Sequence, residues 1–88
     1  MKTLRLTKNY VTIVDDDIYD SLLKYRWRSI RVRNKIFAIR SMVGKDNTWK
    51  ENIFLHRDIL KAPRGKYIRH LNGNTLDNRK ENLIIINL

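Results

Sequence analysis

A histidine and several amides gather near the carboxyl end of this 88-residue chain, in a segment that could take part in phosphodiester hydrolysis. Residues 70–83 read HLNGNTLDNRKENL, so one histidine, four asparagines and one aspartate lie between short apolar runs. An imidazole titrates near neutral pH and can activate water, and protein oxygens can hold the divalent ion that such hydrolysis needs. The pattern looks like part of a nuclease site.

The motifs upstream of this segment extend the pattern. LHRDIL at residues 55–60 is followed by the turn-rich APRGK at 62–66 and by YIRH at 67–70. In this order the motifs closely resemble those of the HNH homing-endonuclease family of phages and mobile introns. The resemblance is specific over residues 53–83. It is weaker over residues 11–27, where a Val-Asp pair, a tyrosine-bearing helix and a tryptophan strand match.

The resemblance implies a role for each of three positions. His70 matches the general base of the family, and Asn78 matches the asparagine that orients this base. The family reads Asp-His where this chain reads Arg69-His70, and that aspartate holds the metal ion. A further ligand comes from a helix after the second strand, whereas this chain ends at Leu88. We therefore expect a truncated ββα-metal finger in which His70 and Asn78 are vestigial.

Arg69 is the departure that decides the expected activity. A guanidinium carries only donors and keeps its proton at ordinary pH, so it cannot bind a cation. At about 4 Å and an effective dielectric of about 20, two like unit charges repel by roughly 4 kcal/mol, and a divalent ion doubles this cost. Asp77 is the nearby acid that could substitute, but its position at a turn gives it another task. We therefore predict no metal site. Mg²⁺ or Mn²⁺ would be a cofactor only if the nuclease site is functional.

The same replacement can favour binding. An arginine facing the scissile phosphate can form a bidentate contact with it, so affinity for DNA can survive while turnover is lost. The pair His56-Arg57 also matches the family, and either helix initiation or a phosphate contact by Arg57 explains it.

The overall charge points to a polyanionic partner. Lysine and arginine number 19 against 9 acids, which gives a formal charge of +10 on a small surface. Double-stranded DNA is the expected partner, although charge alone does not distinguish it from RNA. The expected DNA-binding residues include six cations on one predicted strand pair, with no acid among them, and three from the finger. They are Lys24, Arg26, Arg28, Arg31, Arg33, Lys35, Arg57, Arg69 and Arg79.

Periodicity and turn residues predict the elements that must position these side chains. Asp15-Asp16-Asp17 is expected to cap a helix and complement its dipole, without other chemistry. Trp27 is predicted to be buried, whereas Trp49 is placed in a polar loop and is the better candidate for stacking on bases. The predicted strands are residues 3–7, 10–14, 25–28, 36–42, 52–55, 67–70 and 83–86, and the predicted helices are residues 17–24 and 56–61.

Together these features predict one α+β domain with a small twisted antiparallel sheet and short helices. Residues 1–50 would form a β-rich N-terminal subdomain and residues 51–88 an HNH-like finger without its terminal helix. The chain has no cysteine, no membrane-spanning run and no signal peptide, so we expect a soluble protein in the cytoplasm of a bacterial host. The oligomeric state is not predictable from these features.

The predicted function is that of a phage-type, HNH-endonuclease-like DNA-binding protein whose nuclease activity is lost or strongly reduced. Two alternatives stay open. One is an active metal-dependent nicking endonuclease, which would need a ligand from Asp77, from a dimer partner or from residues outside this chain. The other is a protein-interaction module in which the scaffold binds a host enzyme.

Overall fold

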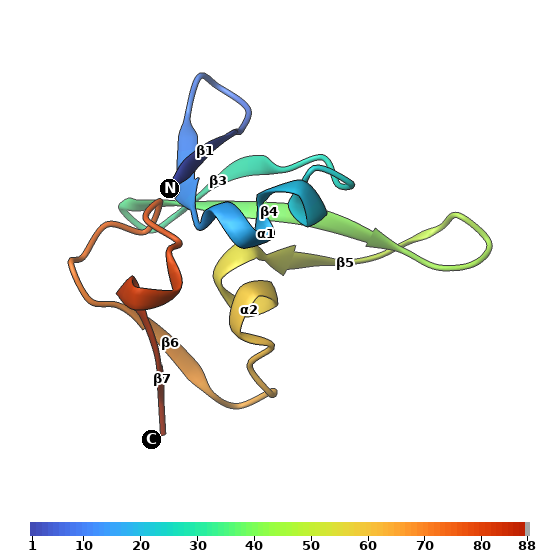
Figure 1. Cartoon of the computed structure of the whole chain (residues 1–88). Helices are drawn as coiled ribbons and strands as arrows, with labels where there is room; N and C mark the ends of the chain where they lie inside the picture. Colours follow the sequence, from blue (N-terminus) through green and yellow to red (C-terminus); the bar gives the residue numbers. More distant parts are fainter. Residues whose placement is uncertain (88) are drawn as a thin grey trace.

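The computed structural model describes residues 1–87, which form short strands and helices in an α+β arrangement (Figure 1). Most strand pairs are antiparallel, as the sequence predicted, and the two α-helices have seven and six residues. The elements are β1 (Lys2–Arg5), β2 (Val11–Val14), α1 (Asp16–Leu22), β3 (Arg28–Val32), β4 (Lys35–Val43), β5 (Trp49–Phe54), α2 (Leu55–Leu60), β6 (Tyr67–His70), the 3-10 helix η1 (Lys80–Asn82) and β7 (Leu83–Ile86).

The strands form three separate sheets instead of the one twisted sheet that the sequence predicted. β1 pairs with β2, the order β3-β4-β5 makes a three-stranded sheet, and β6 pairs with β7. The first two sheets meet through side-chain bonds and not through a ladder, since the Ser29 amide donates to the Thr7 hydroxyl at 2.9 Å and the Ser29 hydroxyl to the Thr7 carbonyl at 3.0 Å. Four-residue strands end before a shared ladder can extend between them.

The predicted first hairpin is confirmed, and its turn has the expected chemistry. Lys8 and Asn9 both adopt positive φ, at 59° and 65°, which is the conformation that a two-residue hairpin turn needs. Helix α1 then begins at Asp16, with acids in its first turn. The side chain of Asp15 does not cap this helix, because its carboxylate accepts the backbone N–H of Lys80 at 2.8 Å.

Strand β3 begins at Arg28, not at Tyr25, so one sequence prediction was wrong. The chain turns back on α1 here, because the Tyr25 amide donates to the Leu22 carbonyl at 3.2 Å and the Trp27 indole N–H donates to the same carbonyl at 2.9 Å. Trp27 is 4% exposed, as predicted. Lys24 and Arg26 therefore lie in an irregular turn and share no strand face with Arg28.

The hydrophobic core joins the first two sheets to both helices. Its buried members come from β1, β2, α1, the turn before β3, β4 and α2, and Ile59 of α2 packs against them. They are Leu4, Val14, Leu22, Trp27, Ala38 and Leu55. The β6–β7 pair contributes no member to this cluster, although Leu83 of β7 is buried, and polar bonds also hold the loop between the two strands.

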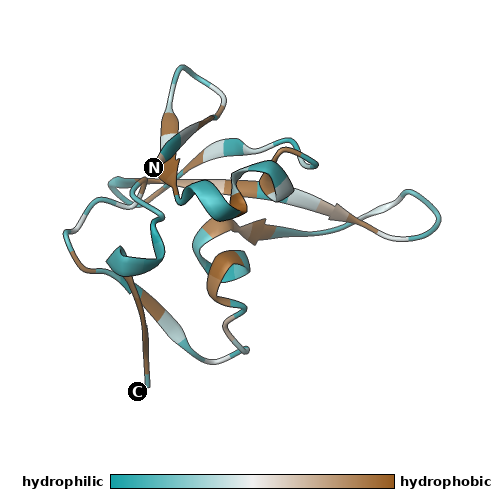
Figure 2. Cartoon of the chain, viewed as in Figure 1, coloured by the Kyte–Doolittle hydropathy of each residue, from teal (hydrophilic) through white to brown (hydrophobic). Residues whose placement is uncertain are grey.

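The β4–β5 hairpin extends beyond both helices as a projecting arm, defined as residues 41–52 (Figure 1). Its tip, residues 44–48, is the predicted loop and is hydrophilic, whereas β7 is strongly hydrophobic (Figure 2). Strand β5 begins at Trp49, earlier than predicted, so Trp49 belongs to the strand and not to the loop; it is 62% exposed. Within residues 1–87, no helix has the length and apolar character needed to cross a membrane.

The core makes a direct stability prediction at Leu55, which is fully buried. Leu55→Ala should lower the free energy of unfolding by about 2–5 kcal/mol, because it removes buried methyl groups and leaves a cavity. Leu23 is 53% exposed at the end of α1, so Leu23→Ala should change the free energy by no more than about 0.5 kcal/mol. Urea unfolding of both variants measures this difference, and equal losses would contradict the assigned core.

Candidate functional site

The loop between β6 and β7 is shaped by its own amides. The Asn72 side-chain oxygen accepts the Asn74 amide at 2.9 Å, and the Asn82 side-chain oxygen accepts the Asn72 amide at 3.0 Å. The Asn82 side-chain NH₂ also donates to the Asp77 carbonyl at 2.8 Å. Gly73 follows the turn with φ of 78°. These contacts bear out the prediction that Asn72 and Asn82 serve turns and caps.

The same loop is fastened to the first hairpin by the backbone. Ile13 donates its amide to the Leu76 carbonyl at 2.8 Å, and its carbonyl accepts the Asn78 amide at 2.8 Å. These two bonds form a parallel bridge between Ile13 and Asp77. Residues about 65 positions apart in sequence are therefore in fixed register, which places the loop against β2.

A chain of side-chain hydrogen bonds runs from β2 to His70. The Thr12 hydroxyl donates to the Leu76 carbonyl at 2.7 Å, the Asn78 NH₂ group donates to the Thr12 oxygen at 2.7 Å, and His70 Nε2 lies 2.9 Å from Asn78 Oδ1. Thr12, Asn78 and His70 are 0%, 1% and 8% exposed. The predicted pairing of Asn78 with His70 is thus present.

We call this chain of hydrogen bonds, which joins Thr12, Asn78 and His70, the relay. The direction in which its members donate determines the tautomer of His70. Since the Thr12 hydroxyl has one proton and gives it to Leu76, its oxygen must accept from the Asn78 NH₂ group. Asn78 Oδ1 therefore faces His70, and Nε2 must carry the hydrogen. The lone pair of neutral His70 lies on Nδ1. That nitrogen is the atom that could accept a proton.

Two aromatic rings lie against the imidazole of His70, and a third lies against one of these two. The ring centroid of His70 lies 5.1 Å from that of His56 and 6.3 Å from that of Phe37, and Phe54 lies 5.5 Å from His56. Burial lowers the pKa of His56 to about 4, aided by the nearby charges of His70 and Arg57. Burial also lowers the pKa of His70, against the opposing effects of Asn78 and Asp77. Both imidazoles are therefore neutral at pH 7.

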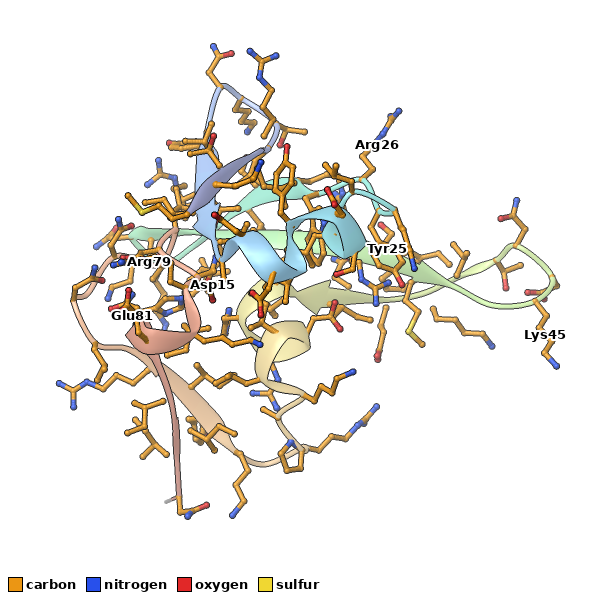
Figure 3. The ribbon with its side chains drawn as sticks, in the orientation of Figure 1. Asp15, Tyr25, Arg26, Lys45, Arg79 and Glu81 are labelled. Carbon is orange, nitrogen blue, oxygen red and sulfur yellow. The ribbon has the colours of Figure 1, made fainter. Side chains whose placement is uncertain are left out.

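Asp77, the acid that could replace a missing metal ligand, is occupied. Arg79 donates from Nε to Oδ1 at 2.8 Å and from Nη2 to Oδ2 at 2.7 Å, and the Asn72 NH₂ group donates to Oδ2 at 2.9 Å. These bonds, chiefly those from Arg79, lower the pKa of Asp77, while the pKa of Arg79 is raised in return. Arg79 also pairs with Glu81 at 2.7 Å, and the two lie side by side in Figure 3.

The residues near His70 do not fit a divalent cation. No group of three or more histidine, cysteine, aspartate or glutamate side chains in residues 1–87 has the arrangement of a metal site. Arg69 adds a positive charge to the depression that His70 lines, and both oxygens of Asp77 are already used. A hard divalent ion prefers several free oxygen ligands, which this arrangement does not offer.

The cations that do face His70 are exposed. One depression of about 440 Å³ is lined by His70, Arg69, Lys35 and Phe37. A neighbouring depression shares Lys35 and Phe37 and adds Arg33 and His56, so the two lie next to each other. Arg33, Lys35 and Arg69 are exposed, and the ion pairs formed within residues 1–87 use other cations, namely the amino terminus, Arg40, Arg64, Arg79 and Lys80. We call this surface the histidine face.

Arg57 also lines the second depression, but its guanidinium has a structural task. It donates to the Lys66 carbonyl at 2.7 Å and to the Pro63 carbonyl at 2.9 Å, which holds the 61–66 turn against α2. Neither partner is an acid. Arg57 therefore keeps its positive charge beside the site while it positions the turn.

Four of the six cations predicted on one strand pair lie on the β3–β4 hairpin, although not on one face of it, and the other two precede β3. Lys24 and Arg26 line a different depression together with Arg5, and Figure 3 shows Arg26 pointing away from the finger. Arg28 and Arg31 lie on opposite faces of β3, because side chains alternate along a strand. Arg33 and Lys35 alone of these six line the depressions of the histidine face.

Comparison with protein-family models, with curated proteins and with solved structures found no match to this chain.

Two residues of the site were not identified from the sequence. Thr12 reads as an ordinary β-prone residue in a hairpin, and its role depends on a contact 66 positions away. The pair His56-Arg57 was predicted either to initiate the helix or to place Arg57 at a phosphate, and the packing of the His56 ring against His70 was not foreseen. One histidine lies at the start of a short helix and another directly before the loop. This pattern could have indicated that the two imidazoles lie close together.

The relay predicts that the Thr12 hydroxyl supports His70 from a distance. Thr12→Val keeps the shape but removes the acceptor for Asn78, so the free energy of unfolding should fall by about 1–3 kcal/mol. Thr12→Ser keeps the hydroxyl and serves as the matched control. Nitrogen-15 NMR of the imidazoles should show a protonated Nε2 in His70 of the unmodified chain, and a protonated Nδ1 there would contradict the assigned direction.

The buried histidines predict that stability falls as the solution becomes acidic. The unfolded chain binds a proton at His56 near pH 6.5, whereas the folded chain resists it until about pH 4. Stability is therefore complete above about pH 6.5 and decreases between pH 6.5 and 4, by up to about 3 kcal/mol. His56→Phe keeps an aromatic ring but cannot titrate. Urea unfolding at pH 7 and 5 should show a smaller loss for this variant, and an equal loss would exclude His56 as the cause.

Proposed function

We propose that this protein binds double-stranded DNA through the histidine face and that its hydrolytic activity is lost or strongly reduced. The observation that carries the proposal is that exposed Arg69 and Lys35 line one depression with His70, whose imidazole is held by buried hydrogen bonds. Exposed Arg33 lines the neighbouring depression with His56. The resemblance of residues 53–83 to HNH homing endonucleases is a second, independent support. A net charge of +10 agrees with a polyanionic ligand.

The proposed binding follows from the chemistry of the exposed groups. Guanidinium groups bind phosphate oxygens through paired N–H donors, and a lysine ammonium adds a charge without fixed direction. The concave surface beside His70 offers both kinds of group within two neighbouring depressions. Contacts of this type position a duplex and do not read its sequence. The proposed binding is therefore strongly dependent on salt.

The proposed loss of hydrolysis follows from the absence of suitable ligands in the part of the chain that the structure describes. His70 Nδ1 could accept a proton from water, which is the task of a general base. The residues present do not fit the ion that would neutralise charge on the phosphate, since Asp77 is bonded to Arg79 and Arg69 is itself positive. A base without that charge stabilisation gives little acceleration.

The proposal predicts binding of a 20-base-pair duplex in EDTA, measured by gel shift over a series of salt concentrations. Lys35→Gln and Arg69→Gln should each weaken binding several-fold and lower the slope of log K against log salt by about 0.9, because one phosphate contact is lost. Arg26→Gln is the matched control, since Arg26 is exposed in a different depression, and it should leave the slope nearly unchanged.

Nicking of the same duplex with Mg²⁺ or Mn²⁺ tests the second half of the proposal. The unmodified chain should bind without producing a cleaved strand, and Arg69→Asp provides the comparison with the family residue at this position. Efficient metal-dependent cleavage by the unmodified chain would refute the loss of activity. An absence of binding at low salt would refute the DNA-binding function itself.

A further inference from the structure

The outer face of the three-stranded sheet is the side turned away from the hydrophobic core cluster. Ala38 packs in the core with residues of both helices, and Arg40 lies 3.6 Å from Asp58 of α2. Side chains alternate along β4, so Lys35, Phe37, Ile39, Ser41 and Val43 point to the opposite side. In the middle of this face Ile39 is 1% exposed and Phe37 packs against His56, so the face is open chiefly at its two ends. This outer face begins at the histidine face, because Lys35 and Phe37 line its depressions.

The far end of the outer face carries exposed apolar side chains on the projecting arm. The register pairs Val43 with Trp49, so both point to the same side of the sheet. They are 53% and 62% exposed. The register of β4 with β5 shifts between Met42 and Val43. Met42 pairs with Glu51, and both residues point to the opposite side of the sheet.

A cation without an acidic partner lies between the two ends. Arg28 pairs in register with Ile39, and its Nη2 donates to the Ser41 hydroxyl at 3.0 Å and to Asn52 Oδ1 at 3.1 Å. Both partners are neutral, so the charge of Arg28 is positioned on the outer face but not cancelled. Ser41 and Asn52 are exposed, which leaves this part of the face open to a ligand.

The acids of the arm are engaged within the protein. Asp46 accepts the amide of Thr48 at 3.2 Å and its hydroxyl at 2.6 Å, and Glu51 lies 3.8 Å from Arg64. Lys45 and Lys50 are exposed, and Figure 3 shows Lys45 pointing outward at the tip. Asp46 keeps its negative charge because both donors belong to Thr48, so two lysines face one unneutralised acid on the arm. This small positive excess adds to the charge of Arg28 and favours a polyanion as the occupant.

We propose that duplex DNA bound at the histidine face continues along the outer face, where Arg28 contacts its backbone and Trp49 packs against sugars and base edges. This inference rests on the proposed DNA binding. Eight residue steps of about 3.3 Å separate Lys35 from Val43, which makes about 26 Å, or roughly eight base pairs at about 3.4 Å each. The protein would therefore contact most of one helical turn.

Substitution of Trp49 and Arg28 tests this inference with the 20-base-pair duplex. Trp49→Ala should weaken binding about tenfold without changing the salt slope, because an apolar contact releases no counterions. Trp49→Phe should retain most of the affinity. Met42→Ala, on the same arm but the opposite side, is the matched control and should have less than about twofold effect. Arg28→Gln should lower the salt slope by about 0.9.

Tryptophan fluorescence gives a second readout, because Trp27 is buried and Trp49 is exposed. DNA should quench the emission of the unmodified chain and leave that of Trp49→Phe, in which only Trp27 emits, nearly unchanged. Thermal unfolding should show that all these variants are folded.

The outcomes separate this inference from the proposed function. If Lys35→Gln weakens binding while Trp49→Ala and Arg28→Gln bind as the unmodified chain does, DNA occupies the histidine face alone. The inference is then overturned, and the arm is left for a protein partner. If the unmodified chain binds no duplex, both the proposed function and this inference fail.

Discussion

The buried hydrogen bonds of Asn78 are the constraint on which the candidate site depends. Its backbone amide and both ends of its side chain are bonded, to Ile13, Thr12 and His70 respectively. Because an unpaired polar group costs free energy when it is 99% buried, these partners must stay together in the folded chain. The loop between β6 and η1, residues 71–79, contributes nothing to the hydrophobic core cluster. This polar contact and the bridge to β2 hold it in position.

The distribution of charge around the site follows from what each acid already binds. Asp77, Asp15 and Asp46 accept hydrogen bonds within the protein, and the first of these neutralises Arg79. Within residues 1–87, the cations of the histidine face form no ion pair, and they face solvent. Burial keeps the two imidazoles neutral at pH 7. The site thus combines a neutral base with surrounding positive charge, an arrangement suited to holding a phosphate and poorly suited to holding a cation.

The division into three small sheets gives each part of the proposed interface its own support. The β1–β2 hairpin supports the loop after β6, whereas β4 runs from the histidine face to the projecting arm. Alternation along β4 then directs one set of side chains to the helices and the other outward.

Much of the local structure follows from short stretches of sequence. The turn at Lys8-Asn9, the burial of Trp27, the hairpin of β3 with β4 and the two strands around the finger loop depend on turn chemistry and hydrophobic period, which neighbouring residues determine. The pairing of His70 with Asn78 was also predicted, through the resemblance of residues 53–83 to a known family.

Tertiary structure decided the rest, because the deciding contacts join residues far apart in the chain. The Thr12 hydroxyl accepts a hydrogen bond from Asn78, 66 positions away, and the ring of His56 packs on His70. The carboxylate of Asp15 accepts the backbone N–H of Lys80 and does not cap the helix that follows it. The start of β3 at Arg28 also depends on tertiary structure, since the indole N–H of Trp27 donates to the Leu22 carbonyl of α1. Local sequence determines which elements form and which side chains share a face. Tertiary structure determines which of several competing hydrogen-bond partners each polar group takes, because those partners lie far apart in the chain.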